Sequence, residues 1–124
     1  MFEQAISAMA SVMVDPYLLG LIFATTVLGV IIGVLPGLGA TTGAALLLPF
    51  TLTMDPVHAI AVLATIYVSA TFAGSITAIL INPPGTSAAA ATTFDGYPLA
   101  QKGEAGRALG IAVTSSTVGG IFSV

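Results

Sequence analysis

The sequence predicts an all-α protein of polytopic transmembrane helices, with short re-entrant or broken helices at two Pro-Gly segments. Of its 124 residues, 56% are hydrophobic and 6% are charged, whereas a soluble domain has about 25% charged residues. Residues 16–54 and 56–94 contain no Asp, Glu, Lys or Arg. Each of these stretches is long enough to cross a bilayer, which takes about 20 apolar residues.

Two Asp-Pro pairs predict where the long helices begin. Asp15 and Asp55 can each cap free backbone N–H groups, and the Pro that follows suits the first helical position, where no N–H is needed. We therefore expect membrane-crossing helices over about 16–34 and 56–81, and a third over 107–124.

The segments between these helices have a different composition. Residues 35–53 and 82–93 are expected to be broken or re-entrant, and 94–106 to be a polar loop because of its Gly and Pro residues. The stretch 40–50 is too short to cross a bilayer and too apolar to lie in water, which favours a re-entrant hairpin.

Small residues recur at intervals of four along both long helices. They are Gly29, Gly33 and Gly37 in the first helix, then Ser69, Ala73 and Thr77 beside Ala70, Gly74 and Ala78 in the second. Such stripes let helix backbones approach closely in lipid, where packing drives association. We therefore expect both helices to pack against neighbours.

The two Pro-Gly segments form the candidate substrate-binding site. Broken helices at membrane depth survive only beside protein or water, and transporters use them to turn free N–H groups toward an anion and carbonyls toward a cation. The alternative is that both segments are short interfacial turns. The candidate residues are Pro36, Gly37, Gly39, Thr41, Thr42, Asn82, Pro84, Gly85, Thr86 and Ser87.

Charge restricts how such a site can work. No Lys or Arg lies between residues 16 and 100, so an anion there is held by backbone dipoles, and two helix N-termini offset about one negative charge. A ligand with two or three negative charges would exceed this, which predicts coupling to a proton or a sodium ion. Lys102 and Arg107 both fall in the expected polar loop, which places that loop on the cytoplasmic side.

Several other classes of function are excluded or disfavoured. The absence of Cys removes disulfides and thiolate chemistry, two cations are too few for a nucleic-acid partner, and no metal or cofactor site is expected. An intramembrane hydrolase would need a base close to Ser75, but His58 lies 17 residues away on the same expected helix, or about 25 Å. We therefore expect no enzyme activity and assign no catalytic residues. Tyr67 and Phe72 are interpreted as packing residues.

The isolated acidic residues and His58 have structural interpretations. Asp15 and Asp55 are interpreted as helix caps, Asp95 as a residue that fixes a turn, and His58 as an imidazole at a helix start near the headgroups. A proton relay through His58 is the alternative.

The ends of the chain carry two further predictions. The first fourteen residues contain Glu3 and no Lys or Arg, which argues against a cleaved signal peptide. An apolar helix without a polar residue after it suggests a piece of a longer chain.

Separated blocks then occur in one order: GVLPGLG at 33–39, AGSITAIL at 73–80, NPPGT at 82–86 and DGYPLA at 95–100, followed by Gly103 and ALG at 108–110. In these blocks the sequence resembles the large membrane subunit of tripartite tricarboxylate transporters, over nearly all residues from about 15 onward.

This resemblance implies a multi-pass carrier of the bacterial inner membrane that imports carboxylates such as citrate, driven by an ion gradient. It implies a periplasmic solute-binding protein and a small membrane subunit as partners. Residues 36–42 and 84–87 fall on the family's motif segments. The alternative from another class is a small helical membrane scaffold or pore component that binds no substrate.

Overall fold

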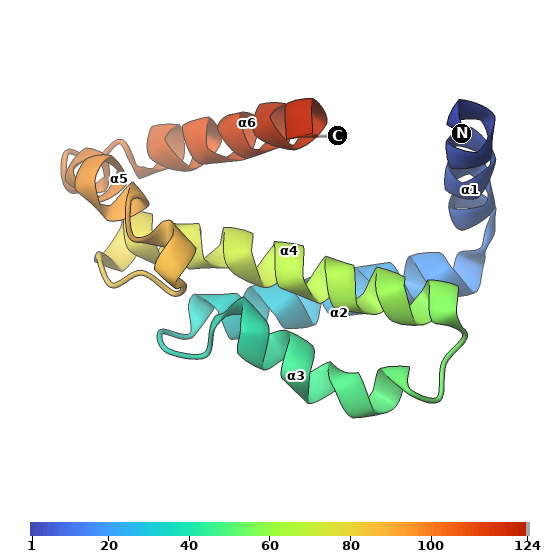
Figure 1. Ribbon diagram of the computed structural model, residues 1–124. Coiled ribbons are helices and arrows are strands. Elements are labelled where there is room, and N and C mark those ends of the chain that lie inside the picture. The colour runs from blue at the N-terminus through green and yellow to red at the C-terminus, as the bar shows by residue number, and fades with distance from the viewer. Residues whose placement is uncertain (124) are drawn as a thin grey trace.

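In the computed structural model, which describes residues 1–123, the chain is helical throughout (Figure 1). The described residues contain no strand, which confirms the all-α expectation. The elements are α1 (Phe2–Val14), α2 (Pro16–Val34), α3 (Gly39–Thr51), α4 (Pro56–Ile81), the 3₁₀ helix η1 (Ser87–Ala89), α5 (Thr92–Gln101) and α6 (Ala105–Ser123).

The centre of the fold is the pair α2 and α4, which lie side by side and run in the same direction (Figure 1). Both helices begin at one end, where His58 Nε2 of α4 lies 3.3 Å from Asp15 Oδ2. Because the two helices are parallel, residues 35–55 have to bring the chain back along α2. Helix α3 does this, running opposite to both.

Both Asp-Pro pairs cap their helices, which confirms that interpretation. Asp15 Oδ1 accepts hydrogen bonds from the N–H groups of Tyr17 and Leu18 at 2.9 and 3.2 Å. Asp55 Oδ2 accepts one from the N–H of Val57 at 3.1 Å. These bonds satisfy donors that a helix start leaves free, so each Asp fixes where its helix begins.

Small residues make the contact between α2 and α4, as their spacing predicts. A Cβ atom added to Gly33 would overlap the backbone of Ala70, and one added to Gly29 would overlap the side chain of Ser69. The two backbones are therefore closer than any larger residue permits, which is the packing that helices use in lipid.

Among the described helices, α2 and α4 are long and apolar enough to cross a membrane. Only 22% and 28% of their apolar windows are buried, so they are not the enclosed core helices of a soluble domain. Helix α6 does not reach the same apolar character, because Thr114, Ser115, Ser116 and Thr117 interrupt it. The third crossing expected over 107–124 stays a prediction, and Val124 lies outside the described residues.

The segments between the long helices are more ordered than the sequence suggests. Residues 35–53 form a turn and the single helix α3, so the chain is broken at Pro36 and Gly37 and then resumes. The loop expected over 94–106 is wrong for its first half, because α5 covers Thr92–Gln101 and places Asp95 in its first turn. Pro98 lies inside this helix, whose exposed surface tolerates the missing N–H.

A tight turn at the end of α5 takes the place of the second half of the loop expected over 94–106. Gly103 has φ +82°, its N–H donates to Ala100 O, and the N–H of Glu104 donates to Leu99 O, at 3.0 Å each. This pair of bonds is a Schellman motif, which needs a left-handed residue that Gly provides. A turn of three residues therefore joins α5 to α6.

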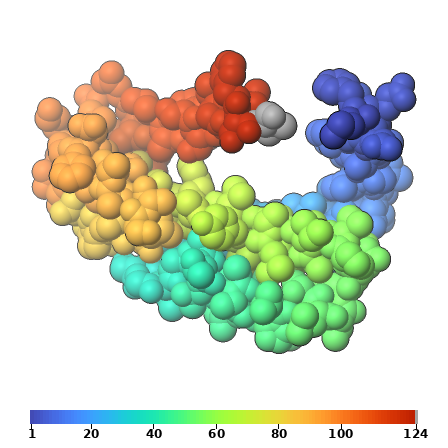
Figure 2. Space-filling view, in the orientation of Figure 1, coloured from blue at the N-terminus to red at the C-terminus, as the bar shows by residue number. Residues whose placement is uncertain are grey.

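The outline of the molecule is an open C (Figure 2). Helices α2, α3 and α4 form its back, while α1 and the α5–α6 hairpin form its two arms. Helix α1 was not expected from the sequence, and it contains no buried residue.

Candidate functional site

The first Pro-Gly segment makes a tight turn that leaves the start of α3 uncapped. Gly37 and Gly39 have φ of +93° and +57°, conformations that cost Gly little. No side chain caps α3, and no hydrogen bond to the N–H groups of Gly39, Ala40 or Thr41 is found in residues 1–123. Three backbone donors at a helix N-terminus, where the dipole is positive, are therefore free.

The second Pro-Gly segment folds back onto the helix that precedes it. Asn82 ends α4 with φ +76°, a conformation in which Asn is better tolerated than most residues. After Pro83 and Pro84 the chain returns along α4, and the N–H of Gly85 donates to Gly74 O at 3.3 Å. Asn82 thus has a role in the turn itself.

Three glycines meet where this segment touches the long helices. A Cβ atom on Gly85 would overlap Gly33 O and lie 2.9 Å from Gly74 Cα, and one on Gly74 would lie 2.8 Å from the N of Thr86. The segment therefore packs into the angle between the end of α2 and the middle of α4. This contact brings the second Pro-Gly segment next to the first.

Both segments line one cavity of about 300 Å³. This is the lower end of the size range of small-molecule sites. Seven of the ten candidate residues line it: Gly37, Gly39, Thr41, Pro84, Gly85, Thr86 and Ser87. The structure places the other three, Pro36, Thr42 and Asn82, beside the lining without making them part of it.

Four lining residues were not anticipated as part of the site. Tyr67 and Thr71 of α4 form one wall, and Ala40 and Ala88 complete the two segments. Tyr67 had been interpreted as a packing residue, but it is exposed. Its position one turn from Thr71 on the same helix face was the available signal.

Thr86 is the buried polar residue of the cavity. Only 9% of it is exposed, and Thr86 Oγ1 has no hydrogen-bond partner among the described residues. A buried hydroxyl without a partner costs about 1–3 kcal/mol. Thr86 therefore places an unsatisfied hydroxyl in the wall of the same cavity as the uncapped start of α3.

Larger cavities lie elsewhere, but their linings are more apolar than that of the Pro-Gly cavity. One of about 570 Å³ lies between α4 and α6 and shares Tyr67, Thr71 and Ala88 with the Pro-Gly cavity. Its other residues are mainly apolar or hydroxyl side chains of helix interiors. Because helix interiors offer no free backbone donors, the smaller cavity is the candidate site.

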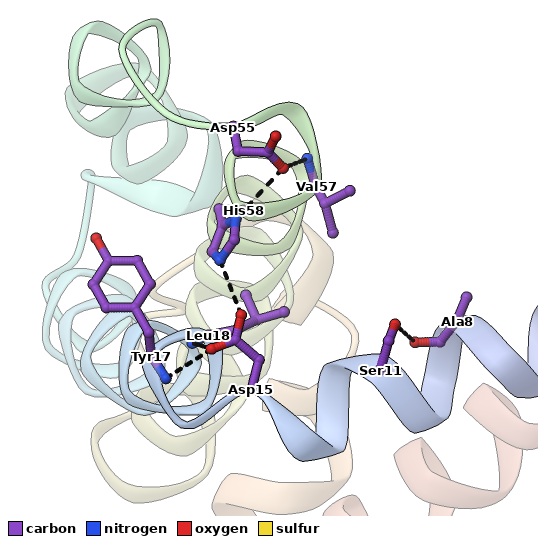
Figure 3. A network of polar contacts seen from close by, with 8 residues as sticks. All are labelled: Ala8, Ser11, Asp15, Tyr17, Leu18, Asp55, Val57 and His58. Atoms are coloured by element: carbon purple, nitrogen blue, oxygen red, sulfur yellow. Dashed lines mark hydrogen bonds and ion pairs between the residues drawn. The ribbon is translucent and has the colours of Figure 1, made fainter.

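A separate polar cluster joins the starts of α2 and α4 (Figure 3). His58 lies between two carboxylates, with Nε2 at 3.3 Å from Asp15 Oδ2 and Nδ1 at 3.5 Å from Asp55 Oδ2. Neither contact has good hydrogen-bond geometry. The cluster therefore brings the capping carboxylates of α2 and α4 to either side of one imidazole ring.

The capping bonds at Asp15 predict a loss of stability in acid. The N–H of Leu18 lowers the pKa of Asp15 below its ordinary value of 3.8, with help from the N–H of Tyr17 and from His58. A lowered folded-state pKa gives stability that is complete above the unfolded pKa and is lost as pH falls through the folded value. We therefore expect the temperature of the unfolding midpoint, followed by helical circular dichroism, to decrease as the pH is lowered below 3.8.

The matched variant for this prediction is Asp15→Asn. Asn keeps an oxygen that can accept from the same N–H groups but does not titrate. Its thermal midpoint should therefore change less between neutral pH and acid than that of the unchanged chain. Identical acid profiles for the two proteins would contradict this role of Asp15.

Two exposed apolar helices that pack through glycine beside a cavity at helix breaks are the features expected of a helical membrane protein. Residues 19–124 match the tripartite tricarboxylate transporter TctA family, and the chain belongs to this family of membrane transporter components. This confirms the resemblance in the separated sequence blocks.

A relative from Agrobacterium vitis is also similar to the chain. It is described as an uncharacterized 52.8 kDa protein in the TAR-I ttuC' 3' region, and it is 49% identical to this chain over 98 residues. The match covers 79% of this chain and 20% of the relative, so the chain spans about a fifth of that protein's length. No solved structure matches the chain.

Proposed function

We propose that this protein is part of the permease of a secondary transporter that imports tricarboxylates or related carboxylates across the bacterial inner membrane. In this proposal it is a multi-pass protein that receives substrate from a periplasmic solute-binding protein and works with a small membrane subunit. One observation carries the proposal: both Pro-Gly segments line a single cavity that also holds free helix N–H groups. A structural scaffold has no use for this arrangement.

The chemistry of the cavity supports a carboxylate ligand. A carboxylate oxygen accepts hydrogen bonds from N–H and O–H groups, and the lining offers the first-turn amides of α3 and the hydroxyls of Thr41 and Ser87. The Thr86 hydroxyl is enclosed, so it would reach a ligand only if the second Pro-Gly segment moves. The lining contains no charged side chain. The helix dipole therefore supplies the attraction, about half a positive charge.

This limited charge supports cation coupling. A di- or tricarboxylate carries more negative charge than one or two helix N-termini offset, so we propose that a proton or a sodium ion enters with the substrate. Uptake that continues at full rate after both gradients are collapsed would refute the coupling.

The orientation proposed here rests on two cations. Lys102 lies in the turn between α5 and α6 and Arg107 in the first turn of α6, where Arg107 Nη1 lies 2.9 Å from Glu104 Oε2 on the exposed surface. Short loops rich in Lys and Arg face the cytoplasm. We therefore propose that this turn is cytoplasmic, which accessibility of a cysteine introduced at Gln101 to a membrane-impermeant reagent would test.

Neighbouring threonines test the site. Thr41 lines the cavity and Thr42 does not, so Thr41→Val should weaken carboxylate uptake while Thr42→Val leaves it near normal. Losing a hydrogen bond to a charged group costs about 1.5–3 kcal/mol, or roughly 10- to 150-fold in affinity. The measurement is uptake of labelled citrate by the complete carrier, normalised to its amount in the membrane.

Thr86→Val separates a binding role from a structural one. If no ligand meets the buried Oγ1, the substitution removes an unsatisfied hydroxyl, so stability rises and uptake is unchanged. If the hydroxyl meets substrate, uptake falls although stability does not. Equal uptake by Thr41→Val, Thr42→Val and Thr86→Val would overturn the proposed site.

A further inference from the structure

Helix α1 has two chemically distinct faces. Four large apolar side chains recur at helical spacing on one face: Phe2, Ile6, Met9 and Met13, exposed by 82, 56, 66 and 73%. The opposite face carries Glu3, Gln4, Ser7 and Ser11. The hydroxyls of Ser7 and Ser11 donate to the carbonyls of Gln4 and Ala8 of the same helix (Figure 3 shows the second bond). No described residue covers the apolar face.

The position of α1 is fixed by its junction with α2. A single residue, Asp15, separates the two helices; its backbone is extended, and its side chain caps α2. Helix α1 therefore ends at the level where α2 starts, and it runs across the direction of α2 and α4 instead of along it (Figure 1).

That level corresponds to a membrane boundary if α2 crosses the bilayer. The 19 residues of α2 span about 28 Å, close to the roughly 30 Å of the hydrocarbon layer. Asp15, Asp55 and His58 gather at this end, and such groups are expensive within hydrocarbon. Exposed Tyr17 lies there as well, and Tyr is enriched at the headgroup level.

We propose that α1 lies on the membrane surface, with Phe2, Ile6, Met9 and Met13 in the boundary between headgroups and acyl chains. The occupant of its apolar face is lipid, because α1 runs across the start of α2 (Figure 1), and the apolar side chains of Leu19 and Phe23 near that start of α2 are exposed as well. The inference rests on α2 crossing the membrane and is independent of what the Pro-Gly cavity binds.

The charge of α1 gives it no preference for anionic lipids. Residues 2–14 contain Glu3 and no Lys, Arg or His, whereas many surface helices bind anionic lipid through a basic polar face. Attachment of α1 therefore depends on buried apolar area. It should be the same on zwitterionic and anionic membranes.

Tryptophan fluorescence tests this directly, because the chain contains no Trp. We compare Met9→Trp on the apolar face with Ser11→Trp on the polar face, in the full chain reconstituted in vesicles that contain lipid brominated near the headgroup. Met9→Trp should be quenched at least about twofold more strongly than Ser11→Trp, as expected for a helix buried about 5–10 Å deep. The difference should persist when phosphatidylglycerol replaces part of the phosphatidylcholine.

Two results would overturn the proposal. Unquenched, blue-shifted emission of Met9→Trp would mean that protein, such as another subunit or a second copy, covers the face. Unquenched, red-shifted emission would mean that α1 lies in water. Met13→Trp on the same face repeats the measurement if Met9→Trp disturbs the helix, and helical circular dichroism checks that α1 remains folded.

Discussion

Gly33→Ala is expected to separate α2 from α4 and to produce the largest loss of stability of any single methyl group added to the long helices. The new Cβ would overlap Ala70 O and lie 2.7 Å from Ala70 Cα. Both are backbone atoms of a helix, so neither can move aside without moving α4. Overpacking of this kind costs about 1–3 kcal/mol. The unfolding midpoint in sodium dodecyl sulfate, followed by circular dichroism, measures it.

Gly20→Ala is the matched control because it makes the same change in the same helix. No atom lies within 4 Å of a Cβ added at Gly20, and Ala favours a helix over Gly by about 1 kcal/mol. This variant should be neutral or slightly more stable. Equal midpoints for Gly33→Ala and Gly20→Ala would show that α2 and α4 do not make this close contact.

Gly85→Ala is expected to displace the second Pro-Gly segment from the candidate site while α2 and α4 remain packed together. Its Cβ would overlap Gly33 O and lie 2.9 Å from both Gly74 Cα and Thr77 Oγ1. The second Pro-Gly segment would have to move away, breaking the bond from Gly85 N to Gly74 O. A cost of about 1–3 kcal/mol corresponds to roughly 5- to 150-fold in binding, measured as the substrate concentration for half-maximal citrate uptake.

Gly110→Ala in α6 is the control for this variant. A Cβ added there meets nothing within 4 Å, so uptake and stability should stay normal. Gly85→Ala with normal uptake at normal abundance would separate the second Pro-Gly segment from transport. A protein that loses uptake but keeps the unfolding midpoint would support a local effect on the cavity.

Local chemistry accounts for the features that the sequence predicted well. The Asp of each Asp-Pro pair caps nearby N–H groups, those of Tyr17 and Leu18 for Asp15 and that of Val57 for Asp55. These pairs therefore mark the starts of α2 and α4 without help from the rest of the fold. The spacing of Gly29 and Gly33 likewise indicates a packing face, because four residues return to the same side of a helix.

Features that depend on contacts between residues far apart in the chain could not be predicted from the sequence. The pairing of His58 with Asp15 requires α2 and α4 to be parallel, and nothing within either helix specifies that direction. Tyr67 joins the cavity for the same reason. Gly and Pro between 94 and 106 suggested a loop, but the exposed position of α5 accommodates Pro98, and only Gly103 acts as a helix stop.

The parallel course of α2 and α4 has a consequence for the thickness of the barrier around the candidate site. If both long helices traverse the bilayer in one direction, α3 makes the return passage, yet its 13 residues extend only about 20 Å. The hydrocarbon layer measures about 30 Å, so lipid beside α3 has to thin, or protein and water have to replace it. A carboxylate resting at the start of α3 would then face a shorter passage to the far side than the lengths of α2 and α4 suggest.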